Sequence, residues 1–340
     1  MTLRVAVIVV NWNGGAHLEA CLRALAAQTE PDFQALVVDN ASQDGSQELV
    51  HALGDPRFSL LQLDTNTGFA RANNLGVRHC GACEFIALLN PDAVPQPDWL
   101  AELMGAAEAF PSKGAFGSHL IDATDRGISD GTGDAYHFCG RAYRRDHGVP
   151  VASSARLAAE IFSPCAAAAL YRRGAWDAAG GFDEDFFCYM EDVDLGFRLR
   201  LLGWGAMHVP TSVCYHAASA FTGRHSDFST YYGQRNMVWT FVKNMPSWLF
   251  WLLSPMHLLL NLAAPIAFTG RGQAGLVLRA KRDALRQWPA LWRKRRAVQS
   301  RRAVGAGAIW KALDKGLWPG RAAVEGESSR RVDTGHDGAG

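Results

Sequence analysis

The stretch "RVAVIVVNW", residues 4–12, is a continuous run of apolar and mostly β-branched residues. Such a run is typical of a strand that is covered on both faces, as strands of parallel sheets are. The segment that follows, residues 17–28, spaces Leu18, Leu22 and Leu25 at the intervals of one helical face. The start of the chain is therefore predicted to be a buried strand followed by a helix.

The same alternation continues over the first hundred residues. Further strands are predicted at residues 33–42, 57–64 and 84–93, and further helices at residues 44–53, 68–79 and 97–110. Repeated strand–helix units predict an α/β, Rossmann-like fold with a mostly parallel, doubly wound sheet flanked by helices.

The following segments are less regular. Residues 111–160 are rich in glycine and charge, and their weak periodicity predicts loops with an irregular hairpin. A small-residue strand, a short helix and a turn are predicted within residues 163–187, and a longer helix begins near Glu191. Two short strands are predicted to end at His216.

Polar side chains follow each of the first four predicted strands. In chain order they are Asn11 and Asn13, Asp39 and Asn40, Asp64 and Asn66, and Asn90 and Asp92. One such end has a plain explanation, because Asn and Asp are good turn residues. Four successive ends at the edge where doubly wound sheets bind ligands predict a small-molecule site.

Three of these ends have specific chemistry. Asp92 follows a buried strand, and a carboxylate there can bind Mg²⁺ or Mn²⁺ that bridges a diphosphate; an ordinary Asp in a turn with Pro91 is the alternative. Asp39 is placed to accept hydrogen bonds from a nucleoside. Gly68 precedes a helix whose N–H groups could face a phosphate, although glycine before a helix is common.

The stretch "CYMEDVDLGFRLRLLGWG", residues 188–205, contains three acids among apolar residues. They are Glu191, Asp192 and Asp194. A helix beginning here places the first two beside the apolar stripe of Leu195 and Leu199, facing the body of the protein. The third can pair with Arg198 at i+4. A partly desolvated carboxylate such as Asp192 is suited to act as a general base.

The C-terminal part has a different composition. Residues 247–268 form a segment without Lys, Arg, Asp or Glu. The segment is long enough to span a membrane, although Pro255 and Pro265 make it a poor membrane span. Eleven Lys or Arg residues and one acid lie between Arg271 and Arg302. This basic, Trp-containing stretch favours an anionic membrane surface as partner. This basic stretch could alternatively bind nucleic acid or be a solvated tail. Nucleic acid is not expected as a partner.

Several motifs occur in a fixed order and carry a resemblance. They are "VAVIVVNWNG", "VVDNASQDGS", "NTGFARANN", "LLNPDA", "GGFDEDFFCYMEDVDLGFRLRLLGW", a downstream "CYH" and then "QRN". Over roughly residues 1–245 the chain resembles glycosyltransferase family 2, close to its rhamnosyltransferase-like members. The resemblance implies a GT-A fold, a nucleotide-sugar donor, Mn²⁺ or Mg²⁺, and inversion at the anomeric carbon.

The resemblance also implies roles for individual residues. The donor-binding set is Asn11, Asn13, Asp39, Asn40, Asn66, Gly68, Asn73, Asn90 and Asp92. Asn90 and Asp92 match the first and last positions of the family's D-x-D metal motif, so an amide replaces one carboxylate. Asp192 matches the proposed base, with Glu191 beside it as the second catalytic acid. His216 matches a histidine that joins the metal in some members; a hydrogen-bonded core histidine is the alternative.

These residues suggest four units in the chain. Residues 1–115 form the nucleotide-sugar-binding half and residues 116–245 the acceptor-binding, catalytic half of one GT-A domain. Residues 246–318 form a helical, membrane-associating extension, and residues 319–340 a disordered tail. The expected acceptor is a glycan or lipid-linked glycan of cell-surface polysaccharide biosynthesis, and the donor sugar rhamnose or another hexose.

Two other functions fit parts of the pattern. A sugar nucleotidyltransferase shares the sheet and metal, but normally has a basic Gly-rich loop after the first strand, where this chain has "NWNGGAHLEA". A non-catalytic, membrane-bound sugar-binding module would not need Asp192.

The seven scattered cysteines and the absence of a recognisable signal peptide suggest a reduced, cytoplasmic setting, peripheral on the inner face of the cytoplasmic membrane. "CGAC" at residues 80–83 is a lone C-x-x-C motif, for which two ordinary thiols are favoured over a redox or metal role.

Overall fold

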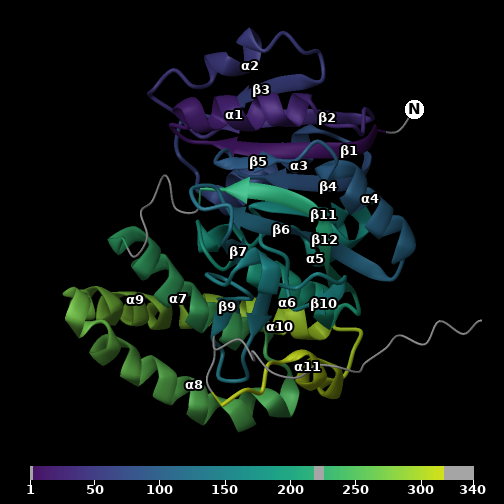
Figure 1. The fold of residues 1–340 in the computed structure, drawn as a ribbon. Coiled ribbons are helices and arrows are strands. Elements are labelled where there is room, and N and C mark those ends of the chain that lie inside the picture. Colours follow the sequence, from purple (N-terminus) through teal and green to yellow (C-terminus); the bar gives the residue numbers. More distant parts are fainter. Residues whose placement is uncertain (1–2, 218–225, 318–340) are drawn as a thin grey trace, which may run out of the picture.

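The computed structural model describes residues 3–217 and 226–317 (Figure 1). The tail predicted to be disordered at residues 319–340 lies outside the described residues.

The chain forms twelve strands and eleven α-helices within those ranges. The strands are β1 (Leu3–Asn11), β2 (Phe33–Asp39), β3 (Phe58–Gln62), β4 (Cys83–Leu89), β5 (Ala93–Pro95), β6 (Lys113–Asp122), β7 (Ser129–Gly131), β8 (Asp134–Tyr136), β9 (Ala142–Arg144), β10 (Ala159–Ile161), β11 (Ala168–Arg172) and β12 (Gly205–His216). The helices are α1 (Gly15–Ala26), α2 (Glu48–Ala52), α3 (Phe69–His79), α4 (Trp99–Ala109), α5 (Arg173–Ala179), α6 (Glu191–Leu201), α7 (Asp227–Asn244), α8 (Ser247–Ala267), α9 (Ala274–Arg286), α10 (Trp288–Ser300) and α11 (Ala306–Ala312). Short 3₁₀ helices are η1 (Val151–Ser153), η2 (Glu184–Phe186) and η3 (Thr269–Arg271).

The main sheet has the strand order β10-β12-β6-β11-β4-β1-β2-β3. The strands β3, β2, β1 and β4 pair in parallel, as the strand–helix alternation predicts, and β12 pairs in parallel with β6. Strand β11 runs antiparallel between β4 and β6 and joins the two parallel groups. The predicted mostly parallel sheet is therefore confirmed, with an antiparallel strand in its middle.

Two details of the second half differ from the prediction. Residues 111–160 were expected to form loops and a hairpin, and the hairpin is present as β8–β9, but β6 is a buried ten-residue strand inside the main sheet. The two short strands expected before His216 are one strand, β12, which is interrupted by an irregularity between Val209 and Val213.

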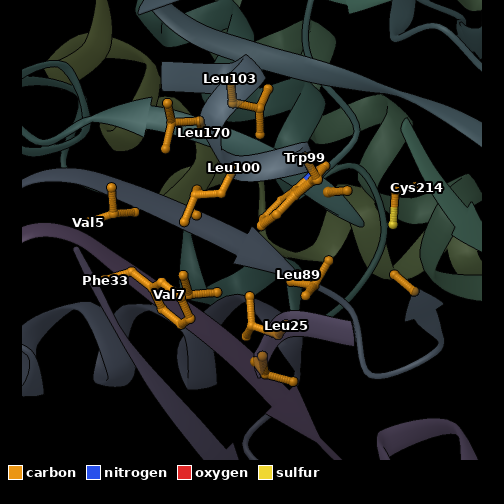
Figure 2. Close-up of a cluster of buried hydrophobic side chains, with 14 of the residues drawn as sticks. Val5, Val7, Leu25, Phe33, Leu89, Trp99, Leu100, Leu103, Leu170 and Cys214 are labelled. Atoms are coloured by element: carbon orange, nitrogen blue, oxygen red, sulfur yellow. The ribbon is translucent and has the colours of Figure 1, made fainter. Parts of the chain in front are cut away.

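Both faces of the sheet are covered, as the composition of β1 predicts. Val5, Val7 and Val9 pack against α1 and α4 in one apolar cluster, part of which is shown in Figure 2. Ala6 and Ile8 point the other way and pack against α3, α5 and α6. This double cover fixes the strands, so that their carboxyl ends hold a constant geometry.

Helices α7 to α11 gather beneath the sheet (Figure 1). Their apolar residues form a third cluster with side chains of α6 and of the segment around β8 and β10. Arg295 of α10 is buried in this cluster and donates to the carbonyl oxygens of Val242 and Met245 at the end of α7. The helical extension is thus attached to the second half of the sheet domain.

Candidate active site

A cavity of about 850 Å³ lies at the carboxyl ends of β1, β2 and β4, between them and the start of α6. Its volume falls in the range usual for sites of small-molecule ligands. Eight of the residues selected from the sequence line it: Asn40, Asn66, Gly68, Asn90, Asp92, Glu191, Asp192 and His216. The cavity therefore brings together most of the predicted donor, metal and catalytic residues, which come from segments far apart in the chain.

Asp92 and His216 face each other across the strand pair β5 and β12. The Asp92 Oδ1 atom lies 3.4 Å from the His216 Nε2 atom, and both side chains are buried. The His216 Nδ1 atom lies 2.8 Å from a carboxylate oxygen of Asp130. Burial alone would lower the pKa of His216, but its contacts with Asp130 and Asp92 outweigh burial and raise the pKa to about 9.

This pair fits a divalent cation. Within the described ranges, the buried Asp92 Oδ1 and His216 Nε2 atoms contact each other without good hydrogen-bond geometry, and the buried Asn90 Oδ1 atom has no hydrogen-bond partner. In metal sites, the imidazole nitrogen that does not bind the metal usually forms a hydrogen bond with a carboxylate. Asp130 is such a carboxylate for the Nδ1 atom of His216. Residues 3–217 and 226–317 hold no cluster of three or more Asp, Glu, His or Cys side chains suited to a metal. A cation held by Asp92 and His216 would thus take its other ligands from substrate phosphates and water, as Mg²⁺ commonly does.

Asp192 lies at the start of α6 and is held at both carboxylate oxygens. The backbone N–H of Ala166 donates to one oxygen at 3.1 Å, and the N–H of Val193 donates to the other at 2.8 Å. Burial raises the pKa of Asp192 above its ordinary value, while the N–H of Ala166 and the charge of Arg144 act in the opposite direction. The result is an oriented, partly desolvated carboxylate at the cavity wall, which is the property of a general base.

Glu191 is more deeply buried. Its Oε2 atom has no hydrogen-bond partner among the described residues. Burial and the neighbouring charge of Asp192 raise the pKa of Glu191 well above its ordinary value. Glu191 is therefore suited to stay protonated beside an ionised Asp192, since two adjacent buried carboxylates resist carrying two charges.

Three charged residues of the site were missed by the sequence reasoning: Asp130, Asp134 and Arg144. They lie on β7, β8 and β9, and the last two line the cavity. The Arg144 guanidinium donates to Asp130 at 3.0 Å and lies 3.8 Å from Asp134. Burial and the charge of Asp192 raise the pKa of Asp134 to about 7. Arg144 thus connects the Asp130–His216 pair with the carboxylates around the predicted base.

Four residues of the predicted donor set do not line the cavity: Asn11, Asn13, Asp39 and Asn73. The Asn11 side chain is fully buried and donates to the Asp39 carboxylate at 2.8 Å, and Asp39 also accepts from the N–H of Ser42. Asn13 is exposed and accepts from the N–H of Gln43. These three side chains fix the loops after β1 and β2.

Asn73 and Gly68 have structural contacts that differ from their predicted roles. Asn73 lies inside α3, where its side chain donates to the carbonyl oxygen of Phe69. Two N–H groups at the start of α3 are occupied: the N–H of Gly68 donates to Asn66, and that of Ala70 donates to the carbonyl oxygen of Phe187. These two N–H groups are therefore not available to a phosphate, whereas Gly68 itself lines the cavity, so its part in donor binding stays a prediction.

Gly68 is required for another reason. Its φ of 82° lies in the left-handed region, and a Cβ atom there would approach the carbonyl oxygen of Phe187 to 2.6 Å. Only glycine accommodates both the backbone conformation and the close contact. Gly68 thereby lets the segment before α6 pack directly on the start of α3.

Asp194 forms the predicted pair with Arg198, at 2.9 Å. It also contacts Lys243 at 2.7 Å and Asn244 at 2.7 Å, both at the end of α7. Asp194 therefore joins α6 to α7 and does not face the cavity.

The seven cysteines are all free thiols. In the "CGAC" segment, burial raises the pKa of Cys80 to about 11, which disfavours the reactive thiolate. The ordinary role predicted for these thiols agrees with this environment.

The overall fold is shared with solved glycosyltransferases of the GT-A type. A mannosyltransferase from Pyrobaculum calidifontis, solved with GDP-mannose and Mn²⁺, superimposes with a TM-score of 0.55, at 22% identity over 92% of this chain and 87% of that chain. GalNAc-T7, solved with UDP, GalNAc and Mn²⁺, superimposes with a TM-score of 0.56, at 13% identity over 70% of this chain and 47% of that chain. These likenesses show that the chain has a GT-A fold.

Sequence comparison is more specific. The model of the family described as glycosyl transferase family 2 matches residues 6–176. An N-acetylglucosaminyl-diphospho-decaprenol L-rhamnosyltransferase of Mycobacterium tuberculosis is 31% identical over 251 residues, which cover 66% of this chain and 79% of that protein. The chain belongs to glycosyltransferase family 2, and it is a glycosyltransferase similar to rhamnosyltransferases.

Proposed function

We propose that the enzyme transfers a deoxyhexose such as rhamnose, or another hexose, from a nucleotide-diphosphate donor to a lipid-linked glycan acceptor, with inversion at the anomeric carbon. The rhamnosyltransferase relative, named for a lipid-diphosphate acceptor, supports this substrate class. The observation that carries the proposal is that one cavity contains the Asp92–His216 pair and the oriented Asp192 carboxylate.

In the proposed mechanism, residues on one side of the cavity bind the donor, and a residue on the other side accepts a proton from the acceptor. Asn40, Asn66 and Asn90 line the side formed by the strand ends, where the donor binds. Asp192 lies at the start of α6, accepts the proton of the acceptor hydroxyl, and so allows its oxygen to attack the anomeric carbon from the face opposite the nucleotide. One displacement of this kind inverts the configuration at that carbon.

The departing nucleotide diphosphate needs positive charge. A divalent cation bound by Asp92 and His216 would stabilise the negative charge that develops on it. Asp130 holds His216 with Nε2 directed to Asp92, and Arg144 compensates the charge of Asp130. The Asn90 amide in place of a carboxylate reduces the negative charge around this pair.

A donor screen tests the proposal. Purified protein is incubated with dTDP-rhamnose, UDP-hexoses or GDP-mannose in Mn²⁺ or Mg²⁺, and release of the nucleoside diphosphate is measured. We expect slow release from one donor, with loss of at least about tenfold on adding EDTA or in the Asp92→Ala variant, because several kcal/mol of charge stabilisation disappear. Asp98→Ala removes an exposed carboxylate six residues away and serves as the matched control.

The outcomes of this screen separate the alternatives. Release that resists both EDTA and Asp92→Ala contradicts the metal role of Asp92. Failure to bind or cleave any donor, with or without a lipid-linked acceptor, contradicts the proposed transferase reaction and favours a binding module.

We also propose that the helical extension holds the enzyme on the cytoplasmic face of an anionic membrane. The helical segment Ser247–Arg271, which consists of α8 and η3, is long and apolar enough to span a bilayer. One side of α8, however, packs on the protein through buried residues such as Leu249 and His257. The His257 ring stacks on Phe241 of α7 with 4.0 Å between ring centroids. A helix held in this way is suited to lie on a surface.

The outward side of α8 remains strongly apolar. Its exposed large apolar residues are Trp248, Trp251, Leu252, Met256, Leu258, Leu259, Leu262 and Ile266. Exposed arginines follow on α9 and α10, namely Arg279, Arg282, Arg286, Arg293 and Arg296. Large exposed apolar patches mark interaction sites, and basic residues beside them select anionic lipid headgroups.

Vesicle flotation tests this surface. The protein should float with vesicles that contain anionic lipid and much less with vesicles of phosphatidylcholine alone, because the arginines contribute about 1 kcal/mol each near the surface. A Trp251→Ser, Leu259→Ser double variant should lose most flotation, whereas Leu157→Ser, an exposed leucine outside the extension, should not. Equal flotation of the double variant and the unaltered protein would contradict a membrane role for α8.

A further inference from the structure

Three aromatic rings line the cavity that contains Asp192. Phe187 and Tyr189 come from the segment between η2 and α6, and Phe228 comes from the first turn of α7. The ring centroids of Tyr189 and Phe228 lie 6.1 Å apart, and Phe228 lies 4.8 Å from Tyr232, which supports it from behind. Phe228 remains 37% exposed at the cavity.

The backbone that carries these rings is strained. Phe187, Tyr189 and Met190 have φ values of 64°, 67° and 70°, which is the left-handed region that non-glycine residues rarely adopt. Such strain persists only where neighbouring contacts enforce it, and it concentrates at binding and catalytic sites. A simple connection between η2 and α6 would not require three strained residues within four positions.

The "QRN" motif supplies the contacts that enforce this backbone. The Asn236 side-chain amide lies 3.0 Å from the carbonyl oxygens of Phe186 and Cys188 and 2.7 Å from that of Tyr189. Arg235 donates to the carbonyl oxygens of Asp185 and Phe186. Both side chains are buried, so this part of α7 is used to hold the ring-bearing segment in place.

The rings have different surroundings. Phe187 is half-buried, because one side lies against Gly68 and the other stacks on Tyr232 with 5.2 Å between centroids. Tyr189 and Phe228 extend the wall, and Tyr189 precedes Glu191 by two residues in the chain; Glu191 and Asp192 line the same cavity. A ligand on this wall therefore meets flat apolar faces on one side and carboxylates close by.

A pyranose ring has the matching chemistry. Its C–H face is apolar and packs on aromatic rings, while its hydroxyls need polar partners at the rim. An alkyl chain would match the rings but would gain nothing from the adjacent Glu191 and Asp192.

We propose that Tyr189 and Phe228 form the acceptor subsite, on which a pyranose ring of the acceptor stacks so that one hydroxyl faces Asp192. Arg235 and Asn236 are positioning residues that hold this wall. The inference rests on the proposed transferase function and adds to it the place and the chemistry of acceptor recognition.

The test uses the donor found in the screen and, as acceptor, N-acetylglucosamine diphosphate carrying a short alkyl chain. Tyr189→Ala and Phe228→Ala should each raise the acceptor KM roughly tenfold, the effect of losing one aromatic contact, with the donor KM within about twofold of the unaltered enzyme. Phe228→Trp should restore the acceptor KM, whereas Phe228→Leu, which is apolar without an aromatic face, should not. Tyr231→Ala is the matched control, because Tyr231 is on the same helix but bonds Asp283 on α9.

Each outcome is decisive. Acceptor KM values unchanged in both alanine variants would overturn the subsite while leaving the proposed function intact. Full rescue by Phe228→Leu would show that an alkyl chain occupies the wall, and would also overturn the proposal. If the unaltered enzyme cleaves no donor and glycosylates no such acceptor, the proposed function is refuted. The proposed acceptor subsite is then refuted as well, because it rests on that function.

Discussion

Replacing Asp192 by asparagine lowers turnover by about 10²–10⁴-fold, the usual contribution of a positioned general base. Asparagine keeps the size of the side chain and can still accept a hydrogen bond from Ala166 or Val193, so the start of α6 should be preserved. It cannot take up the proton of the acceptor hydroxyl. The loss should therefore appear in kcat, with the donor Kd changed little.

Turnover and donor binding are measured separately to test this expectation. Asp177→Asn is the matched control, because this carboxylate is 55% exposed on α5 and does not line the cavity; it should keep the unaltered rate. Asp192→Asn with a rate within about threefold of the unaltered enzyme would exclude Asp192 as the base. A fall in donor binding equal to the fall in rate would instead indicate a structural role.

The pH profile adds a second readout of the same variant. The titratable groups that interact with Asp192 are Glu191, Asp134, Arg144, Cys165, Tyr171 and Cys188. Burial raises the pKa of Asp192, and a base is active only when ionised, so the rate of the unaltered enzyme should fall as pH decreases through this raised pKa. The residual rate of the Asp192→Asn variant should not show this fall as the pH decreases.

The strand–helix alternation of the first hundred residues predicts the fold well because its apolar periodicity is strong. Every strand and helix expected there is present, with ends shifted by a few residues. The strand predicted at residues 84–93, for example, ends at Leu89 because the chain turns at Asn90 and Pro91. The convergence of Asn40, Asn66, Asn90 and Asp92 on one cavity follows from the same topology.

Strand β6 could not be predicted in this way. Its sequence "KGAFGSHLID" has small and polar residues where a strand signal would need β-branched ones. The reason lies in its neighbours, since a Cβ atom on Gly117 would approach Pro164 to 2.9 Å and one on Gly114 would approach Trp204 to 3.0 Å. Tertiary crowding thus requires residues that local propensity disfavours.

The missed part of the site has a similar cause. Asp130, Asp134 and Arg144 lie on strands of three residues each within a glycine-rich segment. A Cβ atom on Gly131 would approach the Arg144 side chain to 2.3 Å, so this glycine makes room for the guanidinium stem. Only the folded chain shows that the glycines and charges of this segment serve one arrangement.

The second large effect is expected at Asp194, where a buried charge network joins α6 to α7. The Asp194 side chain is 0% exposed and contacts Arg198, Lys243 and Asn244. The second carboxylate that contacts Lys243 is Asp183, at 2.6 Å. Because all these groups are removed from water, their charges must be compensated within the protein.

Asp194→Ala should therefore lower the free energy of unfolding by about 3–5 kcal/mol, the usual cost of removing one partner from a buried ion pair. The change leaves Arg198 without its carboxylate and Lys243 with one partner instead of two. Asp177→Ala breaks a pair of the same type, Arg173–Asp177, also four residues apart in a helix but at the surface, and should cost at most about 1 kcal/mol. Denaturant unfolding of both variants measures the contrast. Equal losses would mean that the Asp194 network contributes no more than a surface pair, and that the apolar contacts between α6 and α7 alone hold the catalytic helix in place.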